Sequence, residues 1–290
     1  MDVAVRYNEN SMDTQLPVIG VFDSGFGGLT VLRSLLRYVP AARYIYLGDT
    51  ARLPYGSKSR ETIVRYALSS ARFLADQGAD LLVIACNTAS ALALEEIRAA
   101  LSIPVVGVIE PGARAASESC LTRKATRDVL VLATAATTQS GAYSQALQAL
   151  GLAATEKACP LLVPLVEEGW LDQPTYRCVT LEVLRIYLIE ALAQAPKAST
   201  LLLGCTHYPL LKPLIETTLA TLRHPLEIID SADATARAVA ELLPRLQDVP
   251  RVEAPQCEFY ATDSVEKFQR LGSLFLGQPL VTVRLLDLGG

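Results

Sequence analysis

The chain has 290 residues, of which 51% are hydrophobic and 19% are charged, and its net charge is −4. This much apolar material predicts a large folded core and excludes a disordered chain. The slightly acidic balance excludes the basic surface typical of nucleic-acid-binding proteins. No apolar run approaches the roughly 18 residues of a membrane span, so we expect a cytoplasmic protein without a membrane partner. Residues 1–16 lack the apolar core of a signal peptide and are predicted to form a flexible extension.

Strands and helices alternate in the first half of the chain. Short apolar runs predict buried strands, and apolar residues at helical spacing, such as Ile63, Ala67 and Leu74, predict helices. The expected strands are 17–22, 44–47, 81–85 and 104–109, and the expected helices end near residue 38 and cover 60–76 and 89–100. A repeated strand–helix pattern is typical of a doubly wound parallel sheet.

Two loops follow the first two strands. The loop 23–30 contains three glycines, but its sequence matches neither a dinucleotide fingerprint nor a P-loop. We expect these glycines to let the backbone approach a small ligand. Asp23 lies at the carboxyl end of a strand, where it is either a functional group or a helix N-cap. The loop 48–56 has the same position after its strand, where functional residues are frequent.

The second half repeats the alternation of strands and helices. The expected strands are 129–133, the run before Cys205, 226–229, 257–261 and 281–285, and the expected helices cover 140–150, 174–193, a segment opening near Pro209, and 232–243. No Gly/Ser-rich linker separates the halves, so we expect two packed domains. The predicted first domain comprises 17–110 and about 226–290, and the predicted second domain comprises 111–225.

The six cysteines are irregularly spaced and include no Cys-x-x-Cys pair. In a chain with this much core, a disulfide framework is not expected. The chain has two histidines, and no His/Cys cluster has the spacing of a zinc site, so no metal is expected.

Two of the cysteines occupy equivalent positions. Cys86 and Cys205 each follow an apolar strand and precede a capping residue and a helix, and they lie 205 − 86 = 119 residues apart. A helix N-terminus favours a thiolate over a thiol, although most free cysteines are inert core residues. One such arrangement could arise by chance. Two suggest related halves that face a single site.

Two thiols at one site allow several chemistries. A redox pair usually lies close in sequence, and a hydrolase using Cys205 with His207 would leave Cys86 unexplained. Inversion at a carbon atom fits better, because one group removes a proton from one face while the other delivers a proton to the opposite face. Asp23 and His207 could each assist one thiol.

Seven stretches together resemble glutamate racemases of the cofactor-independent aspartate/glutamate racemase superfamily. They are GVFDSGFGGLTVL (20–32), LGDTARLPYG (47–56), ACNTAS (85–90), VVGVIEPG (105–112), LATAATTQSGAY (132–143), CPLLVPLVEEG (159–169) and LGCTHYPLL (203–211). The resemblance implies two similar doubly wound α/β domains with the active site in the cleft between them. It also implies a homodimer that interconverts L- and D-glutamate without a cofactor and supplies D-glutamate for peptidoglycan.

The resemblance also implies roles for individual residues. By motif position, Cys86 and Cys205 would be the two bases, and Asp23, Glu167 and His207 the auxiliary acid/base groups. Further residues would line the substrate: Ser24, Pro54, Tyr55, Gly56, Asn87, Thr88, Thr137 and Thr206. Phe26 and Thr138 stand where the family commonly has aliphatic residues.

Two alternatives remain open at this point. One is a racemase for aspartate or another small amino acid, against which the glutamate-type stretches 47–56 and 203–211 argue. The other is a protein-interaction module, since some glutamate racemases bind DNA gyrase. The sequence offers no basic or apolar patch for that second role.

Overall fold

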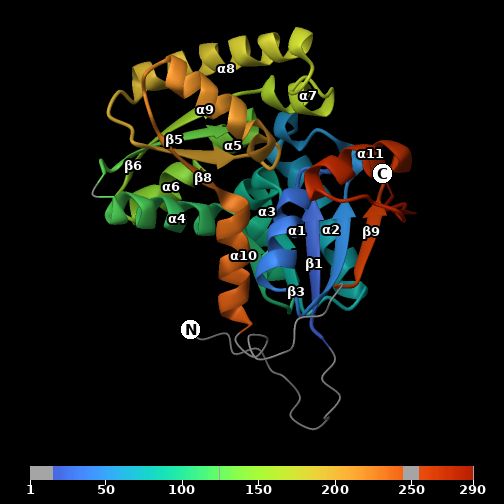
Figure 1. Cartoon of the computed structure of the whole chain (residues 1–290). Helices are drawn as coiled ribbons and strands as arrows, with labels where there is room; N and C mark the ends of the chain where they lie inside the picture. Colours follow the sequence, from blue (N-terminus) through green and yellow to red (C-terminus); the bar gives the residue numbers. More distant parts are fainter. Residues whose placement is uncertain (1–15, 124, 244–254, 290) are drawn as a thin grey trace.

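The structure is a computed structural model that describes residues 16–123, 125–243 and 255–289. It contains two parallel sheets flanked by helices (Figure 1). The strands of the first sheet are β1 (Val18–Asp23), β2 (Arg43–Gly48), β3 (Leu81–Ile84), β4 (Val105–Gly107), β9 (Cys257–Ala261) and β10 (Arg284–Leu285). The strands of the second sheet are β5 (Asp128–Ala133), β6 (Ala153–Ala158), β7 (Thr200–Gly204) and β8 (Glu227–Asp230).

The strand order is β10-β9-β2-β1-β3-β4 in the first sheet and β6-β5-β7-β8 in the second, and every described pairing is parallel. The connecting helices are α1 (Leu29–Tyr38), α2 (Arg60–Asp76), α3 (Asn87–Ala100), α4 (Ile109–Thr122), α5 (Ala135–Ser140), α6 (Ala142–Ala149), α7 (Leu162–Glu167), α8 (Pro174–Gln194), α9 (Lys212–Thr221), α10 (Ser231–Leu242) and α11 (Val265–Leu276). The described residues also include three short 3₁₀ segments: η1 (Thr50–Arg52), η2 (Tyr55–Ser57) and η3 (Tyr208–Leu211). The predicted fold class of two parallel α/β domains is confirmed.

Helices cover both faces of the first sheet. Along β1, Val21 packs in the cluster that contains Leu32 of α1, and its neighbour Phe22 packs in the cluster that contains Ile63 of α2. Successive side chains of a strand point to opposite faces, so both faces here are apolar and covered. This explains why the central strands are continuous apolar runs.

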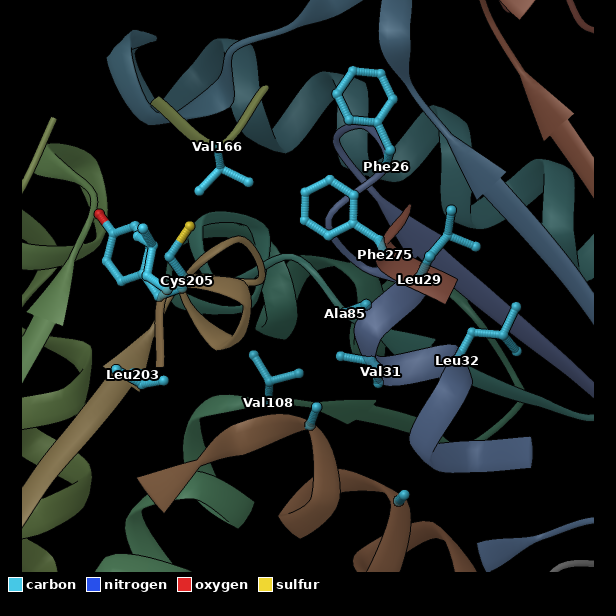
Figure 2. Close-up of a cluster of buried hydrophobic side chains, with 14 of the residues drawn as sticks. Phe26, Leu29, Val31, Leu32, Ala85, Val108, Val166, Leu203, Cys205 and Phe275 are labelled. Atoms are coloured by element: carbon cyan, nitrogen blue, oxygen red, sulfur yellow. The ribbon is translucent and has the colours of Figure 1, made fainter. Parts of the chain in front are cut away.

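The two halves share a hydrophobic cluster. Figure 2 shows Phe26 and Leu29, from the first half, in one cluster with Val166, Leu203 and Cys205 of the second. Each of these side chains is at most 6% exposed. Burial of a common core therefore fixes the two sheets relative to each other, as expected for packed domains.

Most predicted elements are confirmed, and α2 and β9 have the predicted bounds. The predicted strand 104–109 is too long at its carboxyl end, because β4 ends at Gly107 and α4 begins at Ile109. Pro111 is tolerated there since the first turn of a helix needs no N–H donor. Strand β6 was not predicted. Its sequence lacks an apolar run, and it is defined by pairing with β5 along its whole length.

The second sheet extends further than the predicted boundary near residue 226. Strand β8 follows that boundary, and its Glu227 pairs with Thr200 of β7. Beyond β8, α10 returns to the first half, where Asp233 accepts a hydrogen bond from Ser34 at 2.7 Å. The predicted extension 1–16 lies outside the described residues, except for its last residue. No helix in the described part of the chain is long and apolar enough to cross a membrane.

Candidate active site

Cys86 and Cys205 line one cavity of about 500 Å³ between the two halves. Cys86 follows β3 and Cys205 follows β7, so each lies at the carboxyl end of a central strand. Ligands of open α/β sheets bind at this edge. The side chains are 5% and 6% exposed, respectively. The two strand–cysteine units predicted to face one site therefore do so.

The environment of Cys86 is fixed by the start of α3. Its sulfur accepts a hydrogen bond from the backbone N–H of Ala89 at 3.5 Å, so Cys86 is itself the N-cap of this helix. The thiol also lies 3.5 Å from the Ser24 hydroxyl. Burial, together with the negative charge of Asp23, raises the pKa of Cys86 to about 11. The Ala89 N–H at the helix N-terminus does lower the pKa of Cys86, as predicted, but desolvation outweighs this contribution.

Asp23 lies next to the cavity and is fully buried. One carboxyl oxygen, Oδ2, accepts a hydrogen bond from the Gly25 N–H at 2.9 Å, and the other, Oδ1, has no partner among the described residues. Burial raises the pKa of Asp23, although the nearby His207 opposes the shift. Gly28, not Asp23, is the N-cap of α1, so the alternative role as a helix cap is wrong. A buried carboxyl group with a free oxygen is available for proton transfer.

On the second side of the cavity, polar side chains form a chain behind Cys205. The sulfur lies 3.9 Å from His207 Nδ1, and His207 Nε2 lies 3.3 Å from Glu167 Oε1. Lys267 Nζ is 3.2 Å from Glu167 Oε2. Burial raises the pKa of the Cys205 thiol. Burial also pushes the pKa of Glu167 upward, but His207 and Lys267 outweigh this and lower it.

Three threonine hydroxyls meet at the wall of the cavity, where Thr88 and Thr134 line it. Thr88 Oγ1 of α3 lies 3.0 Å from Thr134 Oγ1 and 3.2 Å from Thr137 Oγ1, and the latter two are 2.9 Å apart. Beside them, Asn87 Oδ1 accepts a hydrogen bond from the Tyr143 hydroxyl at 2.6 Å, and the buried Asn87 amide nitrogen has no partner in the described structure. This group can donate hydrogen bonds to an anionic ligand without carrying charge.

The loop that contains Pro54, Tyr55 and Gly56 closes another wall of the cavity. The Tyr55 hydroxyl donates to Asp49 Oδ2 at 2.6 Å, and Thr262 donates to Asp49 Oδ1 at 2.9 Å. The fully buried Asp49 thus ties the loop to the end of β9. The hydrogen bonds of Asp49 to Tyr55 and Thr262 therefore hold the loop in place against the first sheet.

The structure places most of the sequence-predicted site residues on the cavity wall. They are Ser24, Pro54, Tyr55, Gly56, Cys86, Asn87, Thr88, Glu167, Cys205, Thr206 and His207. Asp23 and Thr137 are fully buried and do not line the cavity themselves. Thr134, Cys159 and Lys267 also line the cavity and were not predicted. Thr134 belongs to a quoted motif and caps α5, so its position carried a signal, whereas no motif contains Lys267. In the described parts of the chain, no three His, Cys, Asp or Glu side chains are arranged to hold a metal.

Comparison with known proteins identifies the family. Residues 19–239 match the family described as Asp/Glu/Hydantoin racemase. The glutamate racemase of Koribacter versatilis (strain Ellin345) is 50% identical, over 96% of this chain and 100% of that protein. The glutamate racemase of Aquifex aeolicus (strain VF5) is 45% identical, over 90% of this chain and 94% of that protein.

Solved structures agree with this assignment. The glutamate racemase of Francisella tularensis subsp. tularensis SCHU S4, in complex with D-glutamate, matches with a TM-score of 0.81 and 34% identity, covering 94% of this chain and 98% of that one. The glutamate racemase of Thermus thermophilus, in complex with β-chloro-D-alanine, matches with a TM-score of 0.79 and 42% identity, covering 94% and 97%. Because the family match and these relatives cover most of the sequence, the chain belongs to the glutamate racemases, isomerases of the Asp/Glu/hydantoin racemase family.

Proposed function

We propose that this enzyme interconverts L- and D-glutamate by two proton transfers at the α-carbon, one at each thiol. The observation that carries the proposal is that two buried cysteines, at equivalent strand ends of the two sheets, line one cavity. The relatives named above support glutamate as the substrate. The neighbouring carboxyl group and imidazole supply the acid/base groups that each thiol needs.

In the proposed direction from L- to D-glutamate, the Cys205 thiolate removes the α-proton and the Cys86 thiol delivers a proton to the opposite face. The reverse reaction exchanges these roles. Both thiols have raised pKa values, so each needs a nearby group to take its proton before it can act as a base. The charge of Asp23 acting on Cys86 and the 3.9 Å distance from His207 Nδ1 to the Cys205 sulfur support giving this task to Asp23 and His207.

Heavy water provides the direct test of this mechanism. Each thiol exchanges its proton with solvent independently, so product formed from either enantiomer should carry deuterium at the α-carbon while early unreacted substrate stays mostly protiated. The two enantiomers are separated during the first few per cent of turnover. Nuclear magnetic resonance or mass spectrometry then measures the deuterium content of the product and of the unreacted substrate. Early deuterium in substrate and product alike, from either enantiomer, would contradict the proposal by pointing to one base that serves both faces.

We propose that the carboxylates of glutamate are bound by neutral donors, namely the threonine hydroxyls and the free amide of Asn87. Replacing Thr88 by valine should weaken D-glutamate binding by about 1–3 kcal/mol, because buried hydrogen-bonding groups lose their partner. Isothermal titration calorimetry measures the change in Kd. Thr221→Val, exposed on α9, is the control and should bind as wild type does. Unchanged binding by Thr88→Val would contradict this assignment.

The remaining parts of the proposal rest on resemblance. We propose that the D-glutamate is used in peptidoglycan synthesis and that the enzyme acts as a homodimer. Sedimentation velocity at micromolar concentration tests the second statement, and a monomer that retains full activity would contradict it.

A further inference from the structure

Helix α11 connects the first half of the molecule to the acid/base chain of the second half. It follows β9 of the first sheet, and its Phe268 and Phe275 are fully buried. The ring of Phe275 meets the imidazole of His207 edge-on, with centroids 5.0 Å apart. Figure 2 shows Phe275 in the same cluster as Cys205 and Phe26. The helix is therefore anchored directly against the Cys205 side of the cavity.

The first turn of this helix places Lys267 on the cavity wall. Its Nζ lies 3.2 Å from Glu167 Oε2 and 5.5 Å from the centre of the Phe26 ring. Glu167 therefore has one partner for each oxygen, since its Oε1 lies 3.3 Å from His207 Nε2. A carboxylate held at both oxygens cannot rotate freely, so Lys267 fixes the plane in which Glu167 meets the imidazole.

We propose that Lys267 is a positioning residue, which holds Glu167 against His207 and thereby controls proton transfer at Cys205. The inference rests on the proposed two-thiol function. It assigns a role to a residue outside every motif quoted above, on a helix of the opposite half. Lys267 acts through Glu167 and His207, and no described hydrogen bond joins it to Ser24 or Ala89, the hydrogen-bond partners of Cys86. Its influence should therefore fall mainly on Cys205, because the acid/base chain that it holds contacts that thiol.

Isotope effects can detect an influence on one thiol. The two enantiomers have equal free energies, so kcat/KM must be the same in both directions for any variant, and rates alone cannot locate the slowed step. With α-deuterated L-glutamate, the labelled proton is removed at Cys205. With α-deuterated D-glutamate, it is removed at Cys86, and Cys205 delivers a solvent proton afterwards. Slower transfer at Cys205 therefore raises the isotope effect on kcat/KM for L-glutamate and lowers it for D-glutamate.

The experiment compares wild type with Lys267→Met, Lys267→Arg and Arg270→Met. Because Lys267 is 43% exposed, we expect Lys267→Met to lower kcat/KM by about two- to fivefold. Its isotope effects should diverge, rising for the L-enantiomer and falling for the D-enantiomer. Lys267→Arg retains a cation for Glu167 and should restore the wild-type isotope effects. Arg270→Met removes a charge from an exposed position on the same helix and should leave both isotope effects unchanged.

The outcomes separate this inference from the proposed function. Isotope effects that stay equal to wild type, or change alike for both enantiomers in Lys267→Met, would overturn the positioning role alone. A wild-type enzyme that did not racemise glutamate would overturn the proposed function and the positioning role with it. Thermal unfolding of each variant shows that the comparison is made on folded protein. A loss of folded protein would slow both directions but would not change the two isotope effects in opposite senses.

Discussion

Replacing either Cys86 or Cys205 by serine is expected to lower kcat for racemisation by about a thousandfold, in both directions. Serine has nearly the shape of cysteine, so the buried position stays filled, but its hydroxyl is a far weaker acid than a thiol. In the proposed mechanism each direction of the reaction uses one thiol as base and the other as acid, so loss of either one should block both directions. Polarimetry or circular dichroism, starting from each enantiomer, measures the rates.

The other cysteines supply matched controls. Cys178 is exposed on α8 and donates to the Thr175 carbonyl at 3.0 Å, and Cys120 is buried beside Thr200 at 3.4 Å, away from the cavity. Serine at either position should leave kcat within a factor of about two. The Cys86 and Cys205 variants should still bind D-glutamate, which separates lost chemistry from lost structure. Racemisation close to the wild-type rate in either variant would contradict the two-thiol mechanism.

The positions of the two thiols could be predicted because the sequence encodes them locally. Buried parallel strands are continuous apolar runs, and ligands of such sheets bind at the carboxyl ends of the strands. Cys86 and Cys205 each follow such a run, so their place in the sheet follows from the run alone. The strand–cysteine–helix unit occurs twice, and this repeat indicated that the two halves are related and face one site. Both cysteines do line a single cavity.

Features set by the tertiary structure could not be predicted in this way. The edge strand β6 has the sequence AATEKA, and only its pairing with β5 reveals it. Lys267 lies on a helix that was not predicted, and it reaches the cavity because Phe268 and Phe275 of that helix are buried in the shared core. The raised pKa of Cys86 likewise depends on how deeply the folded protein buries this thiol, which the position before a helix does not indicate.

The largest expected effect outside the thiols concerns Gly27, at the contact between the two halves. A Cβ atom at this position would lie 2.3 Å from Thr206 Oγ1 and 2.6 Å from His207 Nδ1. Gly27 does not adopt a left-handed backbone conformation, so the requirement for glycine here is steric. The first turn of α1, which follows this loop, is held to the second half by Thr30 Oγ1, which donates to the Thr206 carbonyl at 3.3 Å.

We therefore expect Gly27→Ala to force apart the loop after β1 and the segment that carries Cys205. A displacement of about 1 Å in a catalytic site costs about a hundredfold in rate, and the overpacked contact should lower the free energy of unfolding by about 1–3 kcal/mol. Gly25→Ala, in the same loop, is the control, because its Cβ would meet only the flexible Leu53 side chain at 3.0 Å. Kinetics and urea unfolding of both variants measure the effects. Wild-type activity in Gly27→Ala would show that the two halves do not need this close approach to assemble the site.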